Sequence, residues 1–336
     1  MAVAPTWPMH MRLFVRLQAA RPRIPHLPWG RCALQLLIIV MALGVRSYRL
    51  GFPLLSNDES FSWRMTQYGT LEVLRRMPGD AHPPLYYLLL QSWAAVWGTS
   101  PAALRSFSVG LGMLCVPLSY AVCLEGARLV PEKMPISAAR GGALFSAWLV
   151  AVHAVQLGPS RTARMYSLGV LLAGLTAWLL LRALRSQGRS EVWWAVYGVA
   201  VAAFCYTHYY AFFTVFAQAL FVLGHLLSRA QRAGLRQVLC SAAGFLFAGT
   251  LALILYSPWV PVLVSQLQQV REGFWIPAVS AKEARWVFFW WGTGLEYESA
   301  LEGLWLVFVI ALAVWTVWRA KLAGWFFYSK RWCPGS

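Results

Sequence analysis

The sequence predicts an all-α polytopic membrane protein, in which about eight helices cross the bilayer and interfacial helices lie in the first outer loop. Hydrophobic residues make up 59% of the chain and charged residues only 12%, whereas a soluble domain has about 45–50% and about 25%. Aromatic residues reach 15%, as expected where amphipathic rings settle at the faces of a bilayer. Apolar runs long enough to cross a membrane recur along the chain. The composition therefore excludes an ordinary soluble enzyme, a disordered chain and a collagen-like fibre.

The predicted elements follow these apolar runs in order. A Pro- and Arg-rich cytoplasmic arm, residues 1–31, comes first, and the absence of a small-residue cleavage site after the first run argues against a removable signal peptide. The transmembrane domain takes residues 32–320 and a cytoplasmic tail residues 321–336. The predicted spans cover about 32–49, 101–124, 141–159, 165–184, 192–206, 209–227, 238–256 and 304–320.

The basic residues decide how one ambiguous apolar stretch, 85–97, is placed. It has about 13 residues, fewer than the roughly 20 that a spanning helix needs. If it lies at the interface, 18 of the 29 Lys and Arg residues fall on the side of the amino terminus and 11 on the other; if it spans, the numbers are reversed. The positive-inside rule favours the interfacial placement, with both termini in the cytoplasm.

The net charge of +17 is explained by the same asymmetry. Nine of the twelve acids fall on the outer side, so the inner side carries most of the excess positive charge. A nucleic-acid partner is therefore not needed to explain the basicity, and we expect none. The six cysteines lie mostly in apolar runs without a CxxC pair, which favours burial over disulfides or metal binding.

Two long outer loops, 47–100 and 257–301, are the expected place of function. The first holds the adjacent acids Asp58 and Glu59, which suit a general base or a metal site, although a solvated turn explains them equally well. Further along, His82 precedes a rigid double proline and Tyr86, although a lone histidine is more often a simple surface residue.

A short outer loop before the fourth span brings together Arg161, Arg164 and Tyr166. The two arginines are three residues apart, so a helix would place them on one face, where they would suit a phosphate clamp. The alternative is that they extend to lipid headgroups. Arg105 at the start of the second span can likewise be a plain membrane anchor. His208 can be a member of an interfacial aromatic belt, whereas Trp259 lies in an aromatic loop that would shape a lipid groove.

Together these segments resemble the GT-C glycosyltransferases, specifically the family 39-like branch of protein O-mannosyltransferases and the aminoarabinose transferase of lipid A. The match extends over about residues 33–280. It rests on Asp58-Glu59, His82-Pro83-Pro84-Leu85-Tyr86-Tyr87, Ala103-Leu104-Arg105, Ser160-Arg161-Thr162-Ala163-Arg164-Met165-Tyr166 and, more weakly, Thr207-His208-Tyr209 and Pro258-Trp259-Val260-Pro261.

The resemblance implies transfer of a sugar, with inversion, from a polyprenyl-phosphate donor to an acceptor hydroxyl on the outer face of a bacterial inner membrane. The phosphate leaves as a stable anion, so cations are more useful than a strong acid. The implied phosphate-binding residues are Arg105, Arg161, Arg164 and Tyr166, and the implied substrate-binding residues are His82, Tyr86, His208 and Trp259. Asp58 would be the base, with Glu59 orienting it or both acids holding a divalent metal, the one cofactor left open.

Two departures from the family leave other functions open. Relatives often carry Glu or Gln where this chain has Thr162, and they are commonly longer. A non-catalytic membrane subunit of the same fold is therefore an alternative. A lipid or sugar transporter is a second alternative, although the predicted spans hold almost no acids and show no repeated halves. Membrane lipids are expected partners, whereas the sugar and the acceptor, whether protein, lipid or glycan, stay undetermined.

Overall fold

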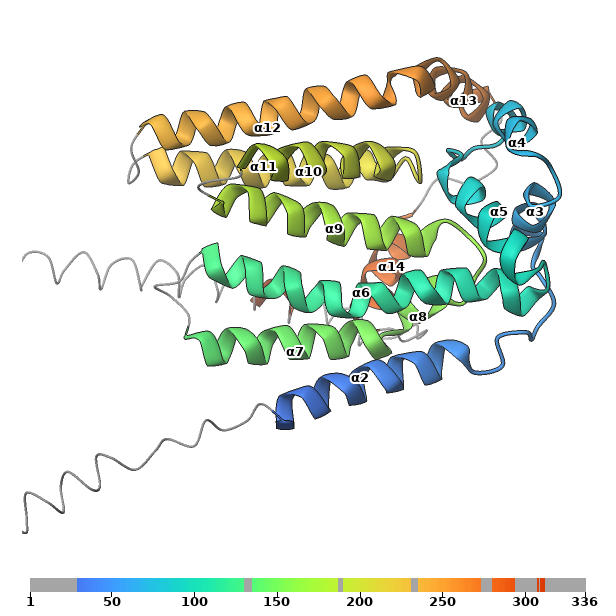
Figure 1. Ribbon diagram of the computed structural model, residues 1–336, viewed down its shortest axis with the longest axis horizontal. Coiled ribbons are helices and arrows are strands. Elements are labelled where there is room, and N and C mark those ends of the chain that lie inside the picture. Colours follow the sequence, from blue (N-terminus) through green and yellow to red (C-terminus); the bar gives the residue numbers. More distant parts are fainter. Residues whose placement is uncertain are drawn as a thin grey trace, which may run out of the picture.

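The structure, a computed structural model, describes residues 29–129, 135–186, 190–230, 235–272, 280–293, 307 and 309–311, and within these ranges the regular elements are all helices. Most of the amino-terminal arm, the tail and most of the eighth predicted span lie outside the described residues. The long helices lie side by side in a bundle, and successive ones alternate in direction (Figure 1). They are α2 (Trp29–Ser47), α6 (Pro101–Leu129), α7 (Ile136–Val152), α9 (Tyr166–Arg185), α10 (Ser190–Cys205), α11 (Ala211–Ala230) and α12 (Leu235–Tyr256).

Four segments of the described chain are long and apolar enough to cross a membrane: Pro101–Leu129, Tyr166–Arg185, Ala211–Ser228 and Val238–Arg271. The pair α7 and α8 (Ala154–Ser160), bent by 55° at a break, gives a fifth if it counts as one span. Cys32–Ser47 and Glu191–Cys205 are apolar but shorter. The described part of the chain is thus all-α, with four to five candidate spans, as in a multi-pass membrane protein. The total of eight stays a prediction.

Helices α10 and α12 approach each other closely at small residues, as is usual for helices in membranes. Helix α6 packs against α7 and α9, and α10 packs against α9 and α12. At Gly198 of α10 a Cβ atom would lie 2.6 Å from the carbonyl oxygen of Ala248 in α12, so the two backbones touch there. Many large apolar side chains on α2, α11 and α12 are exposed, which suits contact with lipid chains.

Arg46 fixes the break between α7 and α8. This arginine near the end of α2 is fully buried, and its guanidinium donates to the carbonyl oxygens of Ala151 at 2.6 Å and Val150 at 2.7 Å. These carbonyls lie in the last turn of α7, where helical partners run out. The Nε of Arg46 also donates to Ser160 Oγ at 3.3 Å. Arg46 therefore caps α7 and holds α8, which leads into residues 161–165.

Most of the short helices gather at one end of the bundle, whereas α14 (Ala281–Thr293) lies near its middle (Figure 1). The helices at this end are α3 (Asn57–Met65), α4 (Thr70–Arg76), η1 (Met77–Gly79), α5 (Leu85–Trp97) and α13 (Val260–Glu272), which follows η3 (Ser257–Trp259). Helix α5 is the ambiguous apolar stretch, and its place among these elements suits an interfacial helix. The turns from α8 to α9 and from α10 to α11 reach the same end. This end therefore unites the segments that carry the predicted site residues.

Candidate active site

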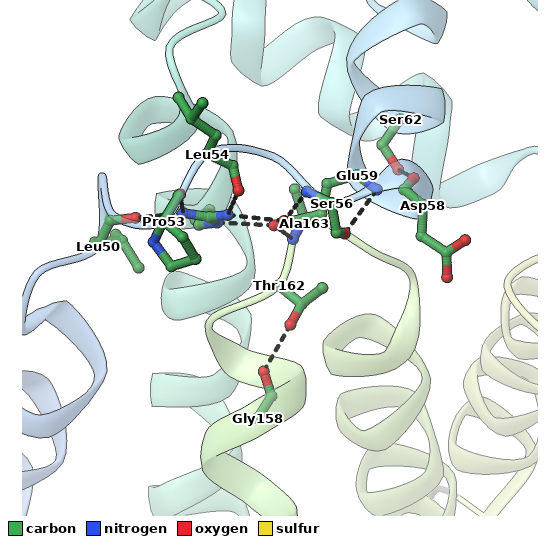
Figure 2. Close-up of polar contacts among 11 residues, drawn as sticks. Leu50, Pro53, Leu54, Ser56, Asp58, Glu59, Ser62, Gly158, Thr162 and Ala163 are labelled. Atoms are coloured by element: carbon green, nitrogen blue, oxygen red, sulfur yellow. Dashed lines mark hydrogen bonds and ion pairs between the residues drawn. The ribbon is translucent and has the colours of Figure 1, made fainter.

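The Glu59 carboxylate accepts hydrogen bonds from the residue that caps α3, from α6 and from the 161–165 turn. Ser56 caps α3 through a reciprocal capping box, in which the Glu59 carboxylate accepts from Ser56 N at 3.1 Å. The carboxylate also accepts from Ala163 N at 2.9 Å and from Arg105 Nε and Nη2, both at 2.8 Å (Figure 2). Burial alone would raise the pKa of Glu59, but the hydrogen bonds from Arg105, Ala163 and Ser56 outweigh it and hold the pKa at about 2. Glu59 is therefore ionised at neutral pH, with both oxygens engaged.

Arg105 is just as fully engaged. Besides Glu59, its guanidinium donates to the carbonyl oxygens of Leu50 at 2.9 Å, Pro53 at 2.7 Å and Leu54 at 3.2 Å (Figure 2). All three guanidinium nitrogens thus have protein partners. The Glu59–Arg105 pair fastens the segment before α3 to α6 and to the 161–165 turn, and a phosphate contact from Arg105 would require these bonds to rearrange.

Arg164 differs from Arg105, because it is buried without a carboxylate partner among the described residues. Its side chain is 5% exposed, and Nη1 donates to Tyr87 Oη at 3.1 Å and to the Asp58 carbonyl oxygen at 3.4 Å. Among the described residues no carboxylate lies within ion-pair distance, and the buried Nε has no hydrogen-bond partner. Burial would lower the pKa of Arg164, but attraction to Tyr87, Asp58 and other nearby acidic groups raises it. A buried cation with a free donor is a place where an anion can bind.

Asp58 lies beside this cation with its carboxylate free. Its side chain is exposed and points away from the Glu59–Arg105 pair (Figure 2). Within the described part of the chain its carboxylate oxygens have no hydrogen bond, whereas its backbone carbonyl oxygen accepts from Arg164 and, at 3.5 Å, from Ser62 Oγ. No group of three or more His, Cys, Asp or Glu residues that would suit a metal ion occurs among the described residues. The arrangement gives Asp58 the freedom to accept a proton.

Asp80 and Tyr87, to which the sequence analysis assigned no role, continue the polar cluster. Tyr87 Oη accepts from Arg164 and donates to Asp80 Oδ2 at 3.4 Å, and the same oxygen lies 3.4 Å from His82 Nδ1. Burial would raise the pKa of Asp80. The interaction with His82, helped by the Ala81 amide and Arg164, outweighs this effect, so the pKa is lowered. The adjacent tyrosines in the sequence were the available signal, and we expected a role for Tyr86. The structure instead places Tyr86 in the core, with its hydroxyl 3.2 Å from Ser108 Oγ.

Three predicted residues meet in an aromatic group next to this cluster. The ring centroids of His82 and His208 are 5.5 Å apart, and those of His208 and Tyr166 are 6.0 Å apart. Burial, together with the charges of His82 and Arg164, lowers the pKa of His208 to about 4. His208 is therefore neutral at pH 7, and its Nδ1 accepts from Tyr210 N at 3.1 Å, which leaves the proton on Nε2.

Arg161 and Trp259 have structural partners of their own. Arg161 Nη2 donates to the Tyr48 carbonyl oxygen at 2.7 Å. Residues 161–165 form turns, so the shared face that a helix would give Arg161 and Arg164 does not arise. Trp259 Nε1 donates to Tyr209 Oη at 3.2 Å, and that hydroxyl donates in turn to Gln266 of α13. Thr162 Oγ1 donates to the Gly158 carbonyl oxygen at 2.9 Å (Figure 2).

The architecture is a helical membrane bundle with short helices at one end. Among solved structures, the chain is similar to a structure of the S. cerevisiae protein O-mannosyltransferase Pmt1-Pmt2 complex bound to the sugar donor, with a TM-score of 0.55 and 17% sequence identity. The similarity covers 81% of this chain and 37% of that chain. No family model matches the sequence, and no curated protein matches it. The likeness establishes the fold.

Proposed function

We propose that the protein is a membrane glycosyltransferase that transfers a sugar from a lipid-linked phosphate donor to an acceptor hydroxyl on the outer face of the membrane. The observation that carries the proposal is Arg164, a buried cation with a free donor and no carboxylate partner among the described residues, next to the free carboxylate of Asp58. The likeness to a donor-bound O-mannosyltransferase supports it at the level of fold.

The chemistry needs two groups of opposite charge on either side of the anomeric carbon. The acceptor oxygen bonds to this carbon as the bond from the carbon to the phosphate oxygen breaks, and a single displacement inverts the configuration. Asp58 takes the hydroxyl proton. Arg164 stabilises the negative charge that develops on the departing phosphate, and its burial strengthens this attraction. Tyr166 is the first residue of α9, directly after the same turn, where it would contact the phosphate.

The remaining predicted residues divide between substrate contact and support. His82 and His208 border the Asp80–Tyr87–Arg164 cluster, so they would contact the sugar, with the neutral His208 donating from Nε2. Glu59 and Arg105 hold α3 and the 161–165 turn in register. A metal bound by Asp58 and Glu59 would have to displace Arg105, Ala163 or Ser56 from Glu59. Tyr86 and Trp259 would have to give up their hydrogen bonds to donate to substrate, whereas Arg161 uses only Nη2 on the Tyr48 carbonyl oxygen.

The test is transfer by the purified protein in lipid nanodiscs. Radiolabelled hexoses and pentoses on polyprenyl phosphate are supplied with protein, lipid and glycan acceptors in turn. Lipid mass spectrometry of the same sample measures donor binding. Donor binding and transfer with inversion support the proposal, whereas binding without transfer indicates a non-catalytic subunit. Label that crosses the membrane without transfer indicates a transporter, and no donor binding at all rejects the proposal.

A further inference from the structure

At the end of the bundle opposite the candidate active site, three arginines converge on one buried acid. Glu125 of α6 is 1% exposed. Its Oε1 accepts from Arg182 Nη1 at 2.8 Å and Arg185 Nη2 at 3.0 Å, and its Oε2 accepts from Arg128 Nη1 at 3.1 Å. Arg128 lies in the last turn of α6, and Arg182 and Arg185 lie in the last turn of α9. We call these four residues the Glu125 cluster.

The Glu125 cluster carries more positive charge than its acid neutralises. Three guanidinium groups face one carboxylate, so its net charge is +2. One arginine would suffice to satisfy a buried carboxylate and to tie α6 to α9. Three arginines held this close repel one another, and the single carboxylate only partly offsets the repulsion. An added anion would complete the neutralisation.

The arginines are also placed to receive such an anion. Their side chains are 36% to 47% exposed, while Glu125 is enclosed beneath them. Each guanidinium uses one nitrogen on Glu125, and within the described residues its other N–H groups have no hydrogen-bond acceptor. Arg182 also lies over the ring of Trp193, 5.2 Å from its centroid, which holds that guanidinium in place. The planar fork of arginine matches the oxygens of a phosphate.

The position of the cluster favours a lipid as the source of that phosphate. Helices α6 and α9 are both candidate spans, and the cluster lies where both end, which is the level of the headgroups. The indole of Trp193 suits the same level. We infer that the Glu125 cluster binds the phosphate of an anionic phospholipid headgroup, with Glu125 gathering the arginines and the guanidinium groups holding the phosphate oxygens.

The test compares two single-charge variants. Arg128→Gln removes a cluster arginine but leaves both contacts between Glu125 and α9 intact, so folding is preserved. Arg140→Gln is the matched control, because Arg140 is an exposed residue of α7 at the same end of the bundle. Native mass spectrometry measures phosphatidylglycerol and phosphatidylcholine bound to each purified protein after delipidation, and the melting temperature verifies folding.

We expect the wild type to retain phosphatidylglycerol in preference to phosphatidylcholine. Arg128→Gln should weaken phosphatidylglycerol binding by roughly tenfold and Arg182→Gln/Arg185→Gln further, while Arg140→Gln binds as the wild type does. Equal binding by Arg128→Gln and Arg140→Gln would overturn the inference. In a second arm, millimolar inorganic phosphate is added. Displacement of the lipid by this concentration would assign the cluster to a soluble phosphate instead and overturn the lipid assignment.

Discussion

Asp58 and Glu59 occupy consecutive positions in the first turn of α3, yet one carboxylate is exposed and the other is 3% exposed. The helix turns them toward different surroundings, so one keeps its oxygens free and the other has both oxygens in hydrogen bonds. When two neighbouring carboxylates lie in different environments, they commonly take different roles in a site. We assign the proton transfer to Asp58 and the structural role to Glu59.

Asp58→Asn tests the first role. The amide keeps the size of the side chain but cannot take up a proton, so we expect transfer to fall by about 10²-fold or more, within the range attributed to general bases. Donor binding, measured by lipid mass spectrometry, should persist because Arg164 is unchanged. Transfer at the wild-type rate would contradict the assignment of Asp58 as base.

Arg164→Lys tests the proposed phosphate contact. Lysine keeps the charge but loses the planar fork. We expect a loss of transfer of roughly 10²-fold, and a larger loss with Arg164→Ala, together with weaker donor binding. Arg161→Lys, in the same turn, is the comparison and should have a much smaller effect. The assignment fails if the two lysine variants behave alike.

Glu59 predicts a dependence of stability on pH. The folded-state pKa of about 2 lies below the ordinary glutamate value of 4.5, so the stabilisation is fully present above about pH 4.5 and is lost as the pH falls toward 2. Its size is on the order of 2–3 kcal/mol. Glu59→Gln should lower the melting temperature at neutral pH and flatten its decline in acid. Glu72→Gln is the control, since Glu72 forms only an exposed pair with Arg76, and an equal effect of both changes would refute this account.

At the level of the elements, the approach of α6 to α8 depends on Gly112. A Cβ atom there would lie 2.3 Å from Ser160 Oγ and 2.8 Å from Ser160 Cβ. Gly112→Ala should therefore force α8 away, destabilise the protein by about 1–3 kcal/mol and lower transfer by displacing the 161–165 turn. Gly110→Ala, in the same helix with open space around it, should be tolerated in both melting temperature and transfer. Equal stability of the two variants would show that the contact is unimportant.

The sequence predicted the long elements well and the tertiary partnerships poorly. The spans predicted at 101–124 and 165–184 correspond to the helices Pro101–Leu129 and Tyr166–Arg185. They were predictable because a long apolar run directly indicates a helix that lies in lipid. The break at His153 was missed, since it depends on Arg46 from a distant segment. The loop over 161–165 was expected, but its attachment to Glu59 was not. The Asp80–Tyr87–Arg164 cluster could not be predicted for the same reason, because its members come from distant segments. Of its members only Arg164 was assigned a role from the sequence, as one of two arginines in a short outer loop.

At the scale of the whole molecule, the arrangement of helices predicts where the loops lie. Residues just before α6 and just after α9 lie at opposite ends of the bundle (Figure 1). In a version without native cysteines, Thr99→Cys should react with an impermeant maleimide from the outside of intact cells. Ser186→Cys should react only after permeabilisation, because the Arg-rich end is expected to face the cytoplasm. Labelling of both positions from one side would refute the topology and remove the proposed site with it.

The buried Arg46 has a consequence for the biogenesis of the protein. Its carbonyl partners Val150 and Ala151 lie 104 and 105 residues further along the chain, so α2 is made long before α7 exists. During that interval the guanidinium has its own-helix partner, the Ala42 carbonyl oxygen, and otherwise the water and headgroups near the end of α2, which its long side chain can reach. Helix α2 can therefore reach its final depth only when α7 and α8 arrive. Nascent chains that stop before residue 136 should leave α2 displaced toward the membrane surface, in a form that quality-control proteases can recognise.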